Sequence, residues 1–194
     1  PAAVAQAAIK TRVARKKIEN FDVYKEQLKQ RLDPTVTIMQ GINNYIKKNQ
    51  KKIIFADGED ENTLKAAIAF KNSKLGIPIL VGKEKKIREQ LKKIGYSGNL
   101  DIEIVNSKDK EKREKYLKFL FEKLQRKEGL LERDCDRIIR NDRVIWTTCM
   151  VACGDADGAV TGNTRRFGVS LEKIKQVVDV RKGEIMFGLN MVVN

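Results

Sequence analysis

From Lys51 onwards, short apolar runs alternate with longer segments of helical periodicity. Three runs, at 52–56, 77–82 and 101–106, are rich in Ile and other apolar residues and predict β-strands. The segment after each run has apolar residues three or four positions apart, which predicts a helix. Strand–helix alternation at this spacing indicates right-handed βαβ units and a parallel sheet. Because the strands are short and apolar, we expect helices on both faces, which makes the fold class α/β, doubly wound and mainly parallel.

The first helix of this region is predicted over "ENTLKAAIAFKNSKLG". Leu64, Ala67 and Ile68 share one face of it, and Gly76 is a candidate C-cap. Further helices are predicted over 83–95 and 108–129, each following one of the apolar runs. These helices are expected to cover the sheet.

Before Lys51 the pattern is helical throughout. An Ala-rich segment carries Val4, Ala7, Ala8 and Val13 on one face, and a second carries Phe21, Tyr24 and Leu28 at helical spacing. "DPT", at 33–35, predicts the end of one helix and the start of the next, with Pro34 in a first turn. A small-residue helix buries too little to be stable alone, so we expect this region to be a helical extension that docks elsewhere.

After Gly129 the chain predicts a short helix, a turn at Asn141–Asp142 and an apolar element. "GAVTG" is a candidate strand, a helix is expected to start at Ser170, and "GEIMFGLNMVVN" is expected to begin a further apolar strand. The sheet would then be interrupted, with an exposed edge around 185–193. Exposed edges pair with other chains, so we expect self-association.

The composition argues against nucleic-acid-binding, zinc-binding and membrane-spanning proteins. The 194 residues carry a formal net charge of +14, no His and three Cys, and aromatic residues make up 6%. The Lys residues are interleaved with Glu, and few aromatic side chains are available to stack on bases, so a solvated basic surface is favoured over a nucleic-acid-binding module. Cys135, Cys149 and Cys153 form no C-x-x-C pair, which predicts reduced thiols in a cytoplasmic protein without a zinc site. No apolar run is long enough to predict a membrane span.

The stretch "CGDADGAVTGNTRRFG" concentrates turn-forming and charged residues. A calcium loop requires an acidic residue at its twelfth position, but counting from Asp155 this is Arg166. A phosphatase of the haloacid-dehalogenase type would use Asp155 as nucleophile and Asp157 as acid, but that family has this motif on its first strand. A third interpretation is an anion-binding loop, in which the N–H groups of 161–163 and an Arg of the pair 165–166 hold a phosphate. A purely structural turn with a capping Asp157 stays equally open on the residues alone.

The order of "KKIIFADGEDENTLKAAIAF", "IPILVG", "IEIVN" and "GDADGAVTGNTR" resembles the phosphate acetyl/butyryl transferase domain. The preceding "AAVAQAAIKTRVARKKIENFDVYKEQL" is similar to the junction in large bacterial NADP-dependent malic enzymes, where a malate-oxidising domain precedes a phosphotransacetylase-like domain. The resemblance implies a truncated form of the isocitrate/isopropylmalate dehydrogenase-like fold. It also implies three parts: 1–20 as the tail of a malic-enzyme nucleotide-binding domain, 21–50 as a helical connector and 51–194 as the first half of the transferase-like domain.

The resemblance further implies a regulatory and oligomer-forming region that binds acetyl-CoA or another phosphate-bearing molecule and has no catalytic residue of its own. NADP and a divalent metal, Mg or Mn, would belong to the full-length enzyme, as would the malate-oxidising machinery. A phosphate acetyltransferase that forms acetyl phosphate is the alternative. Arg166–Phe167 and Trp146 depart from the family's usual pattern. The ligand site implied at the strand ends comprises Asp57, Gly58, Glu59, Asp155, Asp157, Gly158, Thr161, Gly162, Asn163, Thr164 and Arg165.

Overall fold

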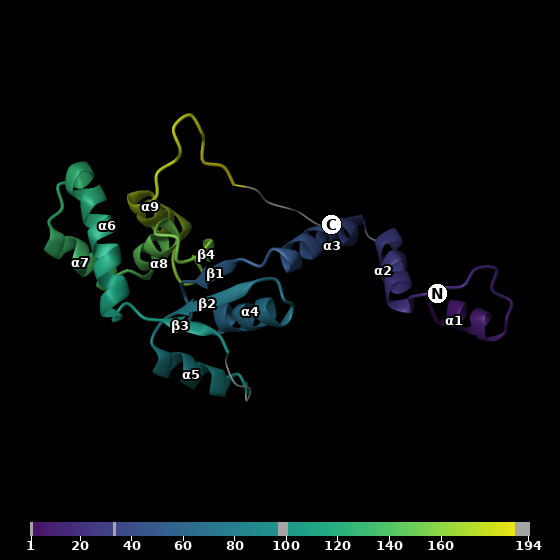
Figure 1. The fold of residues 1–194 in the computed structure, drawn as a ribbon. Coiled ribbons are helices and arrows are strands. Elements are labelled where there is room, and N and C mark those ends of the chain that lie inside the picture. The colour runs from purple at the N-terminus through teal and green to yellow at the C-terminus, as the bar shows by residue number, and fades with distance from the viewer. Residues whose placement is uncertain (1, 33, 97–100, 189–194) are drawn as a thin grey trace. The chain divides into compact units, whose positions relative to one another are not determined.

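The structure, a computed structural model, describes residues 2–32, 34–96 and 101–188 (Figure 1). Two compact units divide the chain, one reaching from the N-terminus to Lys48 and the other spanning Asn49–Gly188. Every helix among the described residues is too short or too polar to cross a bilayer.

The N-terminal unit contains three helices among its described residues: α1 (Ala2–Lys10), α2 (Phe21–Leu32) and α3 (Pro34–Lys48). The predicted start of a helix at Pro34 is confirmed, since proline has no N–H to lose in a first turn. Helix α1 buries none of its residues, as expected for a small-residue helix, and Phe21 packs edge-on against Tyr24. The division of the chain at 20 and 50 remains a prediction.

The second unit is built on four parallel strands in the order β3-β2-β1-β4. They are β1 (Lys52–Phe55), β2 (Ile77–Val81), β3 (Glu103–Val105) and β4 (Gly158–Val160), and the last confirms the candidate strand in "GAVTG". In the register, Ile54 of the central strand lies opposite Ile79 on one side and Ala159 on the other. The predicted parallel α/β sheet is therefore confirmed.

Helices cover both faces of this sheet, as Figure 1 shows. Phe55 and Leu80 point to the face packed by α4 (Glu61–Asn72) and α5 (Glu84–Lys93). Ile54 and Ile79 point to the other face, with α6 (Lys110–Glu128), α7 (Glu132–Asn141), α8 (Arg143–Ala152) and α9 (Phe167–Val177). Alternate strand residues thus contribute to two separate apolar cores, because successive side chains of a strand point to opposite faces.

Gly76 is not a helix C-cap. Helix α4 ends at Asn72 with Ser73 as its cap, and Lys74 takes the positive φ of the turn. A Cβ on Gly76 would lie 2.7 Å from the Lys51 carbonyl oxygen and 2.7 Å from the Phe70 ring. The glycine is required because backbone and ring approach it closely.

The C-terminal part differs from the prediction in two places. Helix α9 begins at Phe167, three residues before Ser170, because Arg166 adopts an extended conformation and accepts the Ser170 N–H. No strand forms over 181–188, where Ile185 and Phe187 are exposed at 83% and 78%. The predicted strand edge continues into residues 189–193, which lie outside the described residues, so self-association stays a prediction.

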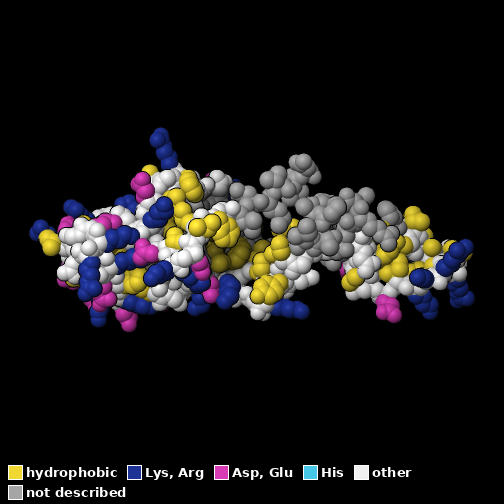
Figure 2. Space-filling view, turned by 90° about the horizontal axis from the view of Figure 1, so that it is seen from above, with side chains coloured by type: hydrophobic (Ala, Val, Ile, Leu, Met, Phe, Trp, Pro, Cys, Tyr) yellow, Lys and Arg dark blue, Asp and Glu magenta, His cyan; other side chains and the backbone are white. Residues whose placement is uncertain are grey.

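Lys and Arg side chains are scattered among Asp and Glu on the face shown in Figure 2. The three cysteines are free thiols, and Cys135 and Cys149 are buried. Burial raises the pKa of Cys149 to about 12, so this thiol stays protonated at neutral pH.

Candidate functional site

The turn after β1 and the loop after β4 meet at the carboxyl edge of the sheet. Thr164 Oγ1 donates to Asp57 Oδ1 at 2.6 Å, and Asn163 Nδ2 donates to Asp60 Oδ1 at 2.5 Å. Asp60 also caps α4 by accepting from the backbone N–H groups of Asn62 and Thr63. Because β1 and β4 are parallel neighbours, both loops leave the sheet on the same side. The predicted meeting of these two turns is confirmed.

Asp155, Asp157 and Gly158 lie at the opposite, amino edge of the sheet, so the predicted gathering of the whole segment 155–165 at one hollow is wrong. Asp157 Oδ2 accepts the Lys52 N–H at 2.9 Å, at the start of β1, and Oδ1 pairs with Lys51 at 3.2 Å. The physical reason is that these residues precede β4 and Thr161–Arg165 follow it. A parallel strand separates its two flanking loops by its own length.

Asp155 fixes this amino-edge segment to α6. Its carboxylate accepts from Lys115 Nζ at 2.7 Å and from the hydroxyl of the fully buried Tyr116 at 2.7 Å. Partial burial acts to raise the pKa of Asp155, but the hydrogen bonds from Lys115 and Tyr116 outweigh it and the pKa lies below its usual range. Asp155 is therefore an ionised structural anchor.

Arg165 is held by an internal carboxylate. One guanidinium nitrogen lies 3.1 and 3.0 Å from the two oxygens of Asp142. Asp142 is also the N-cap of α8, where it accepts from the N–H groups of Val144 and Ile145. Arg165 thus ties the loop after β4 to the start of α8, and Asp142 neutralises its charge. Arg166, the N-cap of α9, is exposed.

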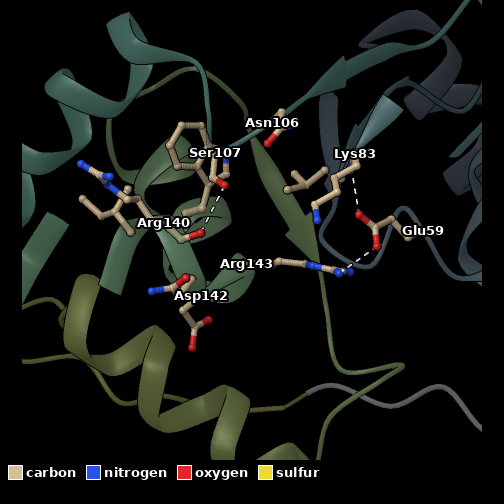
Figure 3. Close-up of a pocket in the computed structure, with 12 residues that line it drawn as sticks. Glu59, Lys83, Asn106, Ser107, Arg140, Asp142 and Arg143 are labelled. Carbon is tan, nitrogen blue, oxygen red and sulfur yellow. Dashed lines mark hydrogen bonds and ion pairs between the residues drawn. The ribbon is translucent and has the colours of Figure 1, made fainter. Parts of the chain in front are cut away.

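A cation-rich cleft lies beside these loops, at the carboxyl ends of β2 and β3 (Figure 3). It consists of a cavity of about 120 Å³ and a neighbouring hollow of about 450 Å³. Its polar walls come from five places: the turn after β1, the loops after β2 and β3, the start of α6, and the junction of α7 with α8. The residues concerned are Glu59, Lys83, Asn106, Ser107, Lys108, Arg113, Arg140, Asn141, Asp142 and Arg143.

Glu59 links three of these walls. Its Oε1 accepts the Lys83 backbone N–H at 2.9 Å, and its Oε2 lies 3.0 Å from Arg143 and 3.5 Å from Lys86. Burial acts to raise the pKa of Glu59. The hydrogen bond from the Lys83 N–H and the positive charges of Arg143 and Lys86 lower it by more, so the pKa falls below its usual value. In Figure 3, Arg143 extends from α8 towards this carboxylate. Gly82 permits the approach, since a Cβ there would lie 2.8 Å from the Glu59 Cγ.

The remaining cations are less completely neutralised. Arg113 and Arg140 share Asp136, at 3.4 and 2.5 Å. The ammonium groups of Lys83 and Lys108 form no hydrogen bond or ion pair with any residue in the described part of the chain. The cleft therefore carries an excess of positive charge and suits an anionic ligand.

Glu59 was among the site residues predicted from the sequence, but the cations of the cleft were not. Lys83 and Lys108 each closely follow a predicted strand, and this position could have indicated that they lie at the carboxyl edge of the sheet. Arg140 and Arg143 come from a helix junction distant in the sequence, and no local pattern places them at this edge. Within the described ranges, no group of three or more Cys, Asp and Glu side chains is arranged to hold a metal ion. The described residues therefore do not fit a divalent metal.

This chain is similar to proteins of two kinds, malic enzymes and phosphotransacetylases. An NADP-dependent malic enzyme of Rhizobium meliloti is 40% identical over 98% of this chain, and a probable NADP-dependent malic enzyme of Rickettsia prowazekii is 39% identical over 98% of it. The chain spans only 25% of the length of each relative. A phosphotransacetylase from Streptococcus pyogenes shares the fold, with a TM-score of 0.68 at 24% identity over 77% of this chain and 44% of that one.

The family model described as phosphate acetyl/butaryl transferase matches residues 37–193. This match includes all four strands and both the carboxyl-edge loops and the cation-rich cleft. The chain therefore belongs to the phosphate acetyl/butaryl transferase family.

Proposed function

We propose that this chain is the regulatory, phosphotransacetylase-like region of an NADP-dependent malic enzyme, and that it binds acetyl-CoA at the carboxyl edge of its sheet. The observation that carries this proposal is the cation-rich cleft, where Lys83 and Arg143 line the smaller cavity and Lys83 and Lys108 line the neighbouring hollow. Acetyl-CoA carries several phosphate oxygens, and Lys and Arg bind such groups through charge-assisted hydrogen bonds. Family membership and the similarity to malic enzymes support the choice of ligand and of parent enzyme.

In this proposal the loops 57–59 and 161–165 flank the ligand. Gly162 would allow its close approach, whereas Gly58 packs against β2, with the Val81 carbonyl oxygen 2.9 Å from where its Cβ would lie. Asn163 and Thr164 would keep the two loops together. Arg165 would act indirectly, by positioning Asp142 at the start of α8. Asp155, Asp157 and Gly158 would take no part in binding, because they lie at the other edge of the sheet.

We further propose that the region has no catalytic turnover of its own. Transfer of an acetyl group from CoA to phosphate requires proton transfer at the CoA thiol, and a good general base has a pKa near the working pH. The chain has no His. Glu59 is paired with cations that lower its pKa, so this carboxylate is a poor base, and the Asp142 carboxylate is already engaged by Arg165. NADP binding, the divalent metal and malate oxidation would belong to the rest of a full-length enzyme, and free thiols favour a cytoplasmic location.

Calorimetric titration of acetyl-CoA tests the proposal. The double variant Lys83→Gln/Arg143→Gln should bind about a hundredfold more weakly or worse, because each of the two lost charged hydrogen bonds contributes ~1.5–3 kcal/mol. Arg137→Gln is the matched control, since this Arg lies on α7 with a side chain 75% exposed and should leave affinity unchanged. Absence of acetyl-CoA binding to the unmodified chain, or equal binding by the double variant, would contradict the proposal.

A phosphate acetyltransferase is the second candidate, and the description of the matched family favours it. An assay for acetyl phosphate formation from acetyl-CoA and phosphate separates the two. We expect no enzymatic turnover by this chain. Turnover that depended on Lys83 and Arg143 would establish the second candidate instead.

A further inference from the structure

Strand β4 forms one edge of the sheet, and its outer side is open. It is hydrogen-bonded to β1, and among the described residues of Asn49–Gly188 no further strand lies beyond it (Figure 1). Ala159 and Val160 are exposed, the latter at 50%. An edge strand presents backbone N–H and C=O groups that can pair with another chain. β4 is therefore a candidate interaction surface.

The two edges of the sheet differ in their protection against such pairing. β3, at the other edge, carries Glu103, whose half-exposed side chain pairs with Lys112 at 3.2 Å. Charged side chains on an edge strand oppose pairing with another chain, because the pairing would remove them from water. The stretch "GAVTG", at 158–162, contains no charged residue. The β4 edge therefore lacks the protection that the β3 edge has.

The charges at the two ends of this stretch are neutralised within the chain. Asp157 pairs with Lys51 at 3.2 Å, and Arg165 pairs with Asp142 at 3.0 Å. A chain with a net charge of +14 repels its own copies over much of its surface. Two copies can approach most easily where charges are absent or already paired, and residues 158–162 meet this condition.

An apolar surface on α9 lies next to this edge. The first five residues of the helix, "FGVSL", are uncharged, and Phe167 and Val169 are exposed at 79% and 44%. A hollow of about 260 Å³ separates the helix from the loop after β4, and it is lined by Thr161, Gly162, Phe167, Ser170, Leu171 and Ile174. Contact with another surface would remove these apolar side chains from water, which stabilises an association.

We propose that two copies of this chain associate through β4, with the two strands antiparallel about a two-fold axis at Val160. A two-fold axis makes the contact self-complementary, as in most homodimers. Val160 is the middle residue of the uncharged stretch, so this register opposes it to its own copy and keeps charged residues outside the pairing. A register centred on Asp157 would instead bring two carboxylates together, which is unfavourable. The two four-stranded sheets then join into one, with α9 of both copies on the same face.

This interface is independent of the proposed acetyl-CoA site. None of the residues of β4 lines the cation-rich cleft. Failure of acetyl-CoA binding would therefore leave the dimer standing, and a monomeric chain would leave acetyl-CoA binding standing.

Analytical ultracentrifugation of the full chain tests the interface. We expect a reversible monomer–dimer equilibrium that strengthens as NaCl is raised, because salt screens the repulsion between two cationic copies. Val160→Lys should weaken dimerisation about tenfold or more, since the symmetry brings the two new ammonium groups together. Ile77→Lys, at the start of β2 and 46% exposed, is the matched control and should dimerise like the unmodified chain.

Three results in this experiment would overturn the proposal. The first is an unmodified chain that stays monomeric at all concentrations and salt levels. The second is a folded Val160→Lys variant that dimerises as tightly as Ile77→Lys. The third is open-ended assembly in place of a dimer, because a two-fold contact closes on itself.

Disulfide cross-linking tests the register without adding a charge. Val160→Cys is made in a Cys153→Ser background, because Cys135 and Cys149 are buried whereas Cys153 is partly exposed. Opposed residues of antiparallel strands have Cβ atoms ~4.5–5.5 Å apart, close to the ~3.5–4.5 Å of a disulfide. Mild oxidation should therefore give covalent dimers of Val160→Cys but not of Ile77→Cys in the same background. Equal cross-linking of the two variants, or none by Val160→Cys, would overturn the proposal.

Discussion

Asp155 joins the segment before β4 to helix α6 through two side chains. Removing it would leave the Tyr116 hydroxyl buried without an acceptor. We therefore predict that Asp155→Ala lowers the free energy of unfolding by ~1–3 kcal/mol at neutral pH. Urea denaturation measures this change. Glu61→Ala, which removes an exposed pair with Lys65, is the control and should have little effect.

The same interaction predicts a pH dependence. The pKa of Asp155 is lower in the folded chain than its ordinary value, so its contribution to stability is present above about pH 4 and is lost as the pH falls through the folded-state pKa. The stability difference between the unmodified chain and Asp155→Ala should therefore shrink in acid. A difference that stayed constant or grew below about pH 4 would contradict the ionised anchor.

At the level of secondary-structure elements, Gly76 allows helix α4 to pack closely against the start of the sheet. A methyl group there would collide with the Lys51 carbonyl oxygen and with Phe70, whose ring packs edge-on against Phe55 at 5.9 Å. We predict that Gly76→Ala lowers the free energy of unfolding by ~1–3 kcal/mol, as overpacking does in dense cores. Gly168 lies in α9, and beyond its own helical turn no described residue comes within 4 Å of the new Cβ, so Gly168→Ala should leave the free energy of unfolding unchanged or slightly higher. Equal effects of the two substitutions would refute the packing role of Gly76.

The elements themselves were largely predictable from local periodicity. The apolar runs at 52–56, 77–82 and 101–106 became β1, β2 and β3, because a strand buried on both faces has few polar positions. The start of α9 was missed because Arg166 caps it without a side-chain hydrogen bond, so no capping residue marks the position. The role of Gly76 was also missed, since its close contacts come from Lys51 and Phe70 and not from its immediate neighbours.

For the molecule as a whole, we expect anion binding to depend less on the net charge of +14 than on the arrangement of a few charges around the cleft. Glu59 joins the turn after β1, the loop after β2 and α8, and its carboxylate occupies donors that a bound anion would also use. We predict that Glu59→Gln raises the affinity for inorganic phosphate by about threefold or more, because it removes a negative charge next to the ligand. Calorimetry measures the affinity, and Glu61→Gln is the control. A weaker affinity in a folded Glu59→Gln variant would make Glu59 a ligand contact and not a competitor.

The alternation of strands and helices, the parallel sheet and the order of the loops could all be predicted from the amino-acid sequence, because each depends on neighbouring residues and on how each element is buried. The sequence also carried the family resemblance. The three-dimensional packing was needed to show that Asp155 and Asp157 lie at the amino edge, that Asp142 holds Arg165, and that the α7–α8 junction brings Arg140 and Arg143 to the cleft. Those contacts join residues far apart in the chain, and their meeting depends on how the crossovers fold over the sheet, which local periodicity does not encode.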